Sequence, residues 1–153
     1  GISKLKGFNL TYDILIYPKQ LPASIELVRR FPEQHFVLDH IAKPLIKDQT
    51  MEPWTKQIRE LAQAPNVSCK VSGMITEASH TEWKPTDIKP YLDVIFEAFD
   101  EDRVMFGSDW PVCLLAGSYQ QVHDLTANYV AGQSASVREK FFGGNAANFY
   151  GIW

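Results

Sequence analysis

The residues best suited to acid–base chemistry follow two short apolar segments. Asp109 comes directly after RVMFGS, where a buried strand would end and no helix has begun. A carboxylate there can accept a proton from water or bind a metal ion without a large pKa shift, since its reference pKa is about 3.9. The alternative is a helix N-cap, but Trp110 and Pro111 delay the next helix, and Ser118 is the better cap. We therefore predict that Asp109 is a catalytic residue.

His40 ends the apolar segment HFVLDH and is the second catalytic candidate. A histidine at a strand end can equally be a satisfied core residue or an acid–base group or ligand. Its expected position at the same end of the fold as Asp109 favours a functional role. Asp39 should point to the opposite face, because side chains alternate along a strand, and we expect it to be a structural hydrogen-bond acceptor or to orient its neighbours. If a metal is used, His40 and Asp109 are the expected ligands.

Other polar side chains near the predicted strand ends are candidates for substrate binding. Lys70 lies in an otherwise apolar strand, so it must either pair with a carboxylate or reach solvent, and the sequence leaves both open. Glu77 and Trp83 can close over a substrate or form a solvated surface with an anchoring ring. The expected substrate-binding residues are Gln20, Lys70, Ser72, Glu77 and Trp110.

Short-range motifs do not complete a metal or nucleotide site. The sequence has no HxH, HExxH or CxxC pattern, so no metal site can be assembled from neighbouring residues. No glycine-rich phosphate loop follows any predicted strand, and nucleotide binding therefore has no support. His35, His80 and His123 lie before a strand, in a polar loop and on a helix, where we expect no chemical role.

Hydrophobic periodicity predicts an alternation of short strands and amphipathic helices. Strands are expected at 12–17, 35–40, 66–73 and 103–108, helices at 21–31, 52–64, 87–99, 118–131 and 136–151, and a loose segment at 74–83. In the last helix we expect a capping box at Ser136 and Glu139, a stop at Gly143 and Gly144, and a final turn capped by Asn145. Strands separated by helices pair in parallel, so an α/β fold is predicted, as an open sheet or a closed barrel. Its functional groups should converge beyond the carboxyl ends of the strands.

Composition excludes several partners and classes. The chain has 153 residues, 45% of them hydrophobic and 22% charged, as in a globular domain with a substantial core. A net charge of −3 without basic clusters argues against nucleic acid. No apolar segment approaches the ~18 residues of a membrane span, so no membrane partner is expected. Cys69 and Cys113 have apolar neighbours, which favours reduced thiols and a cytoplasmic location.

Three motifs in order, FVLDHIAKP, VMFGSDWPV and FFGGNAANFYGI, resemble the C-terminal half of amidohydrolase-related proteins. The similarity runs from about Thr11 to the end and is specific to the branch that includes L-fuconolactonase, L-rhamnonolactonase and 2-pyrone-4,6-dicarboxylate lactonase. The resemblance implies a TIM-like (β/α)8 barrel, of which residues 1–153 form a partial domain of about four βα units. It also implies hydrolysis of a sugar-type lactone, in which Asp109 takes a proton from water and His40 holds the carbonyl oxygen or the water.

The first-strand HxH pair of that family is absent, so we expect this chain to be a fragment of a longer enzyme. Many family members hold a divalent ion such as Zn, while some lactonases work without one, and both options stay open. The alternatives are a metal-dependent decarboxylase or amide hydrolase on the same scaffold, or a noncatalytic half-barrel. Trp110, Pro111 and the DHIAKP segment favour the lactonase branch. The expected partner is a small-molecule lactone, and unpaired strand edges make a homo-oligomer a further expectation.

Overall fold

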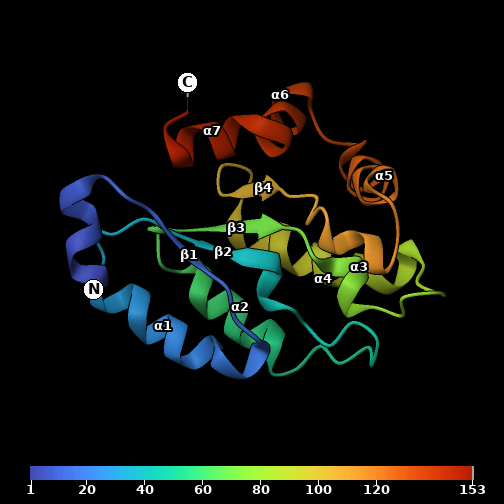
Figure 1. The fold of residues 1–153 in the computed structure, drawn as a ribbon, viewed down its shortest axis with the longest axis horizontal. Coiled ribbons are helices and arrows are strands. Elements are labelled where there is room, and N and C mark those ends of the chain that lie inside the picture. Colours follow the sequence, from blue (N-terminus) through green and yellow to red (C-terminus); the bar gives the residue numbers. More distant parts are fainter. Residues whose placement is uncertain (153) are drawn as a thin grey trace.

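Four parallel strands form the centre of the structure, a computed structural model that describes residues 1–152 (Figure 1). The strands are β1 (Tyr12–Ile14), β2 (Phe36–Leu38), β3 (Val67–Val71) and β4 (Val104–Phe106). They lie in the order β1-β2-β3-β4, with Phe36 paired to both Tyr12 and Val67 and with Cys69 paired to Val104. The predicted parallel α/β fold is confirmed, and all four carboxyl ends lie at one end of the sheet. Each strand is shorter than predicted, because the chain leaves the sheet before the polar residues that follow.

Three helices pack against the sheet and enclose the main core (Figure 1). They are α1 (Leu21–Arg30), α2 (Trp54–Ala62) and α4 (Pro85–Phe99). The predicted apolar stripe of α2 is buried, because Trp54, Ile58, Leu61 and Ala62 recur at helical spacing on one face. The indole N–H of Trp54 donates to the carbonyl of Ile41 at 2.8 Å, so this large ring is buried without an unpaired donor.

Short helical segments precede the first strand and occupy several of the connections. They are η1 (Ile2–Phe8), η2 (Pro18–Gln20), η3 (Asp39–Ala42), α3 (Met74–Glu77) and η4 (Val112–Leu115). The segment predicted to be loose therefore begins with a helical turn, α3, whose Met74 and Ile75 are buried. Burial of these two side chains supplies the stability that the short sequence lacks on its own. Among residues 1–152, no helix is long and apolar enough to cross a membrane.

The C-terminal helices differ from the prediction. They are α5 (Tyr119–Val130), α6 (Ala135–Glu139), the π-helical segment η5 (Lys140–Gly144) and α7 (Asn145–Tyr150). Ser118 caps α5 as expected, but Ser134 rather than Ser136 caps α6, its hydroxyl accepting the N–H of Val137 at 3.2 Å. The predicted stop at Gly143 and Gly144 is wrong, because helical backbone continues through η5 into α7.

Asn145 has a tertiary role in place of the predicted cap. Its side chain is buried, and its amide donates to the carbonyls of Glu101 and Val104 at 2.8 and 2.7 Å. These bonds fix the start of α7 to the chain around β4, and α7 extends past β4 toward the first strands (Figure 1). Hydrogen bonds between distant segments thus hold glycine-rich sequence in a helix that its own propensity disfavours. Both cysteines, Cys69 and Cys113, are buried free thiols, as predicted.

Candidate active site

The side chains of His40, Ser72 and Asp109 meet beyond the carboxyl ends of β2, β3 and β4. The Nδ1 atom of His40 is 2.8 Å from Oγ of Ser72, and its Nε2 atom is 3.6 Å from Oδ1 of Asp109. The side chains of His40 and Asp109 are only 17% and 9% exposed. The predicted proximity of His40 and Asp109 is therefore present in the structure, and it follows from parallel strands that end at one level.

The local backbone that presents these side chains is unusual. His40 and Asp109 have φ angles of 52° and 56°, in the left-handed region, and positive φ continues from His40 through Lys43. Such angles cost about 1 kcal/mol or more for a residue with a Cβ, and strained backbone of this kind is frequent at functional sites. Gly73 makes space for the site, because a Cβ there would lie 2.8–2.9 Å from atoms of the His40 side chain.

Burial sets the charge state of His40. Desolvation lowers the pKa of its imidazole, and the nearby negative charges of Asp109 and Asp39 oppose this effect only in part. His40 is therefore neutral near pH 7 and can act as a hydrogen-bond donor through one ring nitrogen.

Asp109 is not a helix cap. Its backbone carbonyl accepts the N–H of Cys113 at 2.8 Å, but no side-chain cap precedes η4. Its Oδ2 atom is buried and has no hydrogen-bond partner among the described residues. A carboxylate oxygen in that position is costly to leave unpaired, so the geometry favours a bound proton donor or cation at this place.

Lys70 pairs with carboxylates. The sequence left open whether Lys70 pairs with a carboxylate or reaches solvent, and the structure shows the first. Its Nζ atom is 2.7 Å from Oδ1 of Asp39 and 3.0 Å from Oδ2 of Asp13. The hydroxyl of Tyr150, at the end of α7, donates to the same Asp13 oxygen at 2.7 Å. Burial opposes the charge on Lys70, but hydrogen bonds with Asp39, Tyr150 and Asp13 outweigh it and raise the pKa of this amine. Asp39 is thus an ion-pair partner of Lys70, and its structural role stays a prediction.

Asp13 and Tyr150 were not among the predicted site residues. The sequence gives one indication for Asp13, which is an acid within the apolar segment YDILIY. It gives none for Tyr150, which is 137 positions away from Asp13. Burial and the hydrogen bond to Asp13 raise the pKa of Tyr150 to about 12. We call Lys70, Asp39, Asp13 and Tyr150 the lysine cluster.

Two predicted substrate-binding residues make contacts within the chain, and a third is exposed. The side-chain oxygen of Gln20 accepts the backbone N–H of Tyr17 at 2.9 Å, and Glu77 pairs with Lys43 at 2.8 Å. Trp110 is 64% exposed at the same end of the sheet as Asp109. Their described hydrogen bonds and ion pairs, within residues 1–152, do not involve His40 or Asp109, and substrate contact by these residues stays a prediction.

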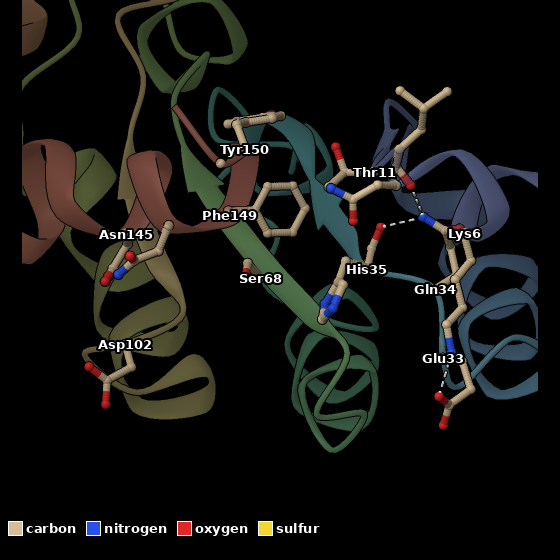
Figure 2. A pocket seen from close by; sticks show the side chains of 14 residues that line it. Lys6, Thr11, Glu33, Gln34, His35, Ser68, Asp102, Asn145, Phe149 and Tyr150 are labelled. Carbon is tan, nitrogen blue, oxygen red and sulfur yellow. Dashed lines mark hydrogen bonds and ion pairs between the residues drawn. The ribbon is translucent and has the colours of Figure 1, made fainter. Parts of the chain in front are cut away.

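One cavity of the structure lies apart from this site. It has a volume of about 550 Å³ and lies beside residues that precede the strands, such as Thr11 before β1 and His35 before β2 (Figure 2). Phe149 and Tyr150 of α7 line another side of it. The cavity is therefore at the amino ends of the strands, whereas parallel α/β folds bind substrates at the carboxyl ends.

The described residues do not by themselves form a metal site. No group of three or more His, Cys, Asp or Glu side chains within residues 1–152 is arranged to hold a metal ion. His40 and the unpaired oxygen of Asp109 nevertheless have the donor types that zinc prefers. These two residues fit a divalent ion only together with ligands from outside the described set.

Comparison with known proteins relates this geometry to a family. The family model described as Amidohydrolase matches residues 1–152. This chain belongs to the amidohydrolase family. It is 37% identical over 165 residues to an L-fucono-1,5-lactonase of Burkholderia multivorans, and 37% identical over 159 residues to an L-fucono-1,5-lactonase of Burkholderia ambifaria. In each comparison 99% of this chain is aligned, with 55% and 53% of the respective relative.

A solved structure supports the fold assignment. The chain superimposes on a zinc-bound amidohydrolase from Burkholderia multivorans with a TM-score of 0.95 and 37% identity. The match covers 99% of this chain and 56% of the other. The chain thus spans about half the length of the relatives that it matches, and its four βα units have the fold of about half of a TIM-like barrel.

Proposed function

We propose that the protein containing this chain hydrolyses a sugar-type lactone to its hydroxy acid. The observation that carries the proposal is the buried pair of His40 and Asp109 beyond the carboxyl ends of β2 and β4, with one carboxylate oxygen unpaired. Relatives named L-fucono-1,5-lactonase, at 37% identity over nearly the whole chain, support a lactone as substrate. The other site ligands and the rest of the pocket come from beyond these residues.

The two side chains divide the chemistry between them. The carboxylate of Asp109 accepts a proton from water, and the water oxygen forms a bond to the lactone carbonyl carbon. Neutral His40 donates a hydrogen bond to the carbonyl oxygen as negative charge develops there. The ring C–O bond then breaks, and the proton on Asp109 passes to the leaving alkoxide. The product is the open hydroxy acid, and Asp109 is again ionised.

A divalent ion such as zinc is the alternative to this hydrogen bond: His40, through an unprotonated ring nitrogen, and Asp109 would hold it. When bound, such an ion supplies a Lewis acid that makes water easier to ionise and polarises a carbonyl. The zinc in the related Burkholderia multivorans structure supports this part of the proposal. Asp109 then keeps its role in accepting the proton. The predicted effect of replacing Asp109 is therefore the same with or without the metal.

The proposal also covers substrate contacts and the oligomeric state. We expect Trp110, Gln20 and Glu77 to contact the sugar portion of the lactone, because they lie on segments that follow β4, β1 and β3. The isolated chain is also expected to form a homo-oligomer. Exposed apolar side chains flank both edge strands, with Leu15 60% exposed beyond β1 and Leu115 67% exposed beyond β4.

A substrate panel tests the proposed reaction in the full-length natural protein. L-Fucono-1,5-lactone and related sugar lactones should release acid faster than their spontaneous hydrolysis, as measured by titration at constant pH. A sugar amide and an aromatic carboxylic acid, assayed for ammonia and carbon dioxide, represent the two rival reactions on this scaffold. Turnover of either of these without lactone hydrolysis, or no turnover of any lactone, would contradict the proposal.

A further inference from the structure

We propose that, when no metal is bound, Ser72 is a positioning residue that holds His40 as the tautomer protonated on Nε2, with this N–H directed toward Asp109. The inference rests on the proposed function and assigns a residue that the reaction would require beyond His40 and Asp109. It starts from one geometric fact: Ser72 and Asp109 contact opposite nitrogens of the same imidazole, at 2.8 and 3.6 Å.

The three residue types are those of a serine-hydrolase triad, but the geometry excludes Ser72 as the nucleophile. Ser72 is 1% exposed, and its Oγ is already occupied by Nδ1 of His40. Gly107 lies against it so closely that a Cβ on this glycine would be 2.9 Å from Cβ of Ser72. A substrate carbonyl carbon has no approach to a hydroxyl enclosed in this way, whereas a nucleophilic serine needs an exposed oxygen. Ser72 therefore acts through His40.

Hydrogen-bond satisfaction selects one tautomer. Within residues 1–152, the hydroxyl of Ser72 has a single described partner, Nδ1 of His40. If Ser72 donates to the Nδ1 lone pair, its buried O–H is satisfied and the ring proton is on Nε2, facing the Asp109 carboxylate. The opposite tautomer would leave the Ser72 O–H without a described acceptor and would turn the Nε2 lone pair toward negative charge. Both consequences are unfavourable in a buried site.

Packing holds the ring in the orientation that this bond requires. Gly73 follows Ser72 directly, and its missing Cβ leaves the volume that the His40 ring occupies, with Cγ and Nδ1 at 2.8 and 2.9 Å from the ideal Cβ position. Ser72 thus supplies the hydrogen bond, and Gly73 supplies the space for the His40 ring. The resulting Nε2–H is the donor that a lactone carbonyl oxygen needs when negative charge develops on it.

Imidazole ¹⁵N NMR of the full-length natural protein, freed of metal by a chelator, tests the inference directly. His40 should show a protonated Nε2 and an unprotonated Nδ1, with the signals assigned by their loss in His40→Gln. Ser72→Ala should convert His40 to a mixture of tautomers, and Ser72→Thr, which keeps the hydroxyl, should restore the wild-type pattern. Ser68→Ala, the same change within β3 but away from His40, is the matched control and should leave the pattern unchanged.

Kinetics separates this role from the alternatives. Ser72→Ala should lower kcat on a sugar lactone by about 10- to 100-fold with little change in KM, as is typical when a partner that orients a histidine is lost. A wild-type His40 protonated on Nδ1, an unchanged tautomer in Ser72→Ala, or a trapped acyl-Ser72 in mass spectrometry would each overturn the inference. Since the NMR readout needs no substrate, an inactive protein with the expected tautomers would refute the proposed function alone.

Discussion

Nε2 of His40 lies 3.6 Å from Oδ1 of Asp109, and each residue has a left-handed backbone conformation shortly after a short parallel strand, β2 or β4. The two side chains come from positions 69 residues apart in the sequence. Neither the pairing nor the conformation is favoured locally, because residues with a Cβ avoid positive φ. The surrounding structure must therefore stabilise this arrangement, and several of its contributions can be tested one at a time.

Gly73→Ala should disturb the site through His40. The new Cβ would lie within 2.9 Å of the imidazole, and the backbone has a φ of 65° that alanine disfavours. We expect a loss of about 1–2 kcal/mol in the free energy of unfolding from the backbone alone, together with displaced His40 resonances in NMR. Gly132→Ala is the matched control, because no atom lies within 4 Å of its Cβ position. Equal urea midpoints for the two variants would show that Gly73 does not support the site.

Lys70→Met should destabilise the protein, because Asp39 loses its ion-pair partner and Asp13 keeps only the hydrogen bond from Tyr150. The Lys70 and Asp39 side chains are 21% and 15% exposed, but Asp13 is 37% exposed and is partly screened by water. The expected loss in the free energy of unfolding is about 2 kcal/mol, below that of a fully buried pair. Lys6→Met breaks the exposed pair with Glu33 and should change stability far less. Similar urea denaturation curves for both variants would contradict a stabilising role for the lysine cluster.

Tyr150 should ionise at an unusually high pH. Burial and its hydrogen bond to Asp13 raise its pKa to about 12 from 10.0. In the unfolded chain the Tyr150 hydroxyl ionises at a lower pH than in the folded protein. The stability that Tyr150 contributes is therefore complete below pH 10 and is lost as the pH rises toward 12. The phenolate absorbance of the wild type minus that of Tyr150→Phe should have its midpoint near pH 12.

The control for Tyr150 is Asp13→Asn, which keeps an acceptor but removes its charge. The midpoint in this variant should move toward lower pH, because the charged acceptor helps to raise the pKa. A wild-type midpoint near the ordinary tyrosine value would show that the contact between α7 and β1 does not form in solution.

Much of the fold follows from local sequence patterns. The α2 stripe at Trp54, Ile58 and Leu61 predicts a buried helix, and alternation of such helices with short apolar strands predicts parallel pairing. The proximity of His40 and Asp109 then follows from topology. The exact hydrogen-bond partners do not, because they depend on how close distant segments come.

Three features could not be obtained from local patterns. The path of the chain through Gly143 and Gly144 depends on the bonds of Asn145 to residues near β4. The lysine cluster depends on α7 bringing Tyr150 to Asp13. Nor does the sequence around Ser72 indicate that its hydroxyl contacts His40 rather than a substrate, since a serine is compatible with either role.

The direct test of the central claim is lactone hydrolysis by Asp109→Asn in the full-length natural protein. Asparagine has nearly the same shape but cannot accept the proton, so kcat/KM on L-fucono-1,5-lactone should fall by about a thousandfold or more while the unfolding curve keeps its wild-type cooperativity. Asp124→Asn, which changes an exposed carboxylate on α5, should keep the wild-type rate. Loss of hydrolysis in Asp109→Asn alone is the predicted result; a folded Asp109→Asn protein with wild-type turnover would contradict the account.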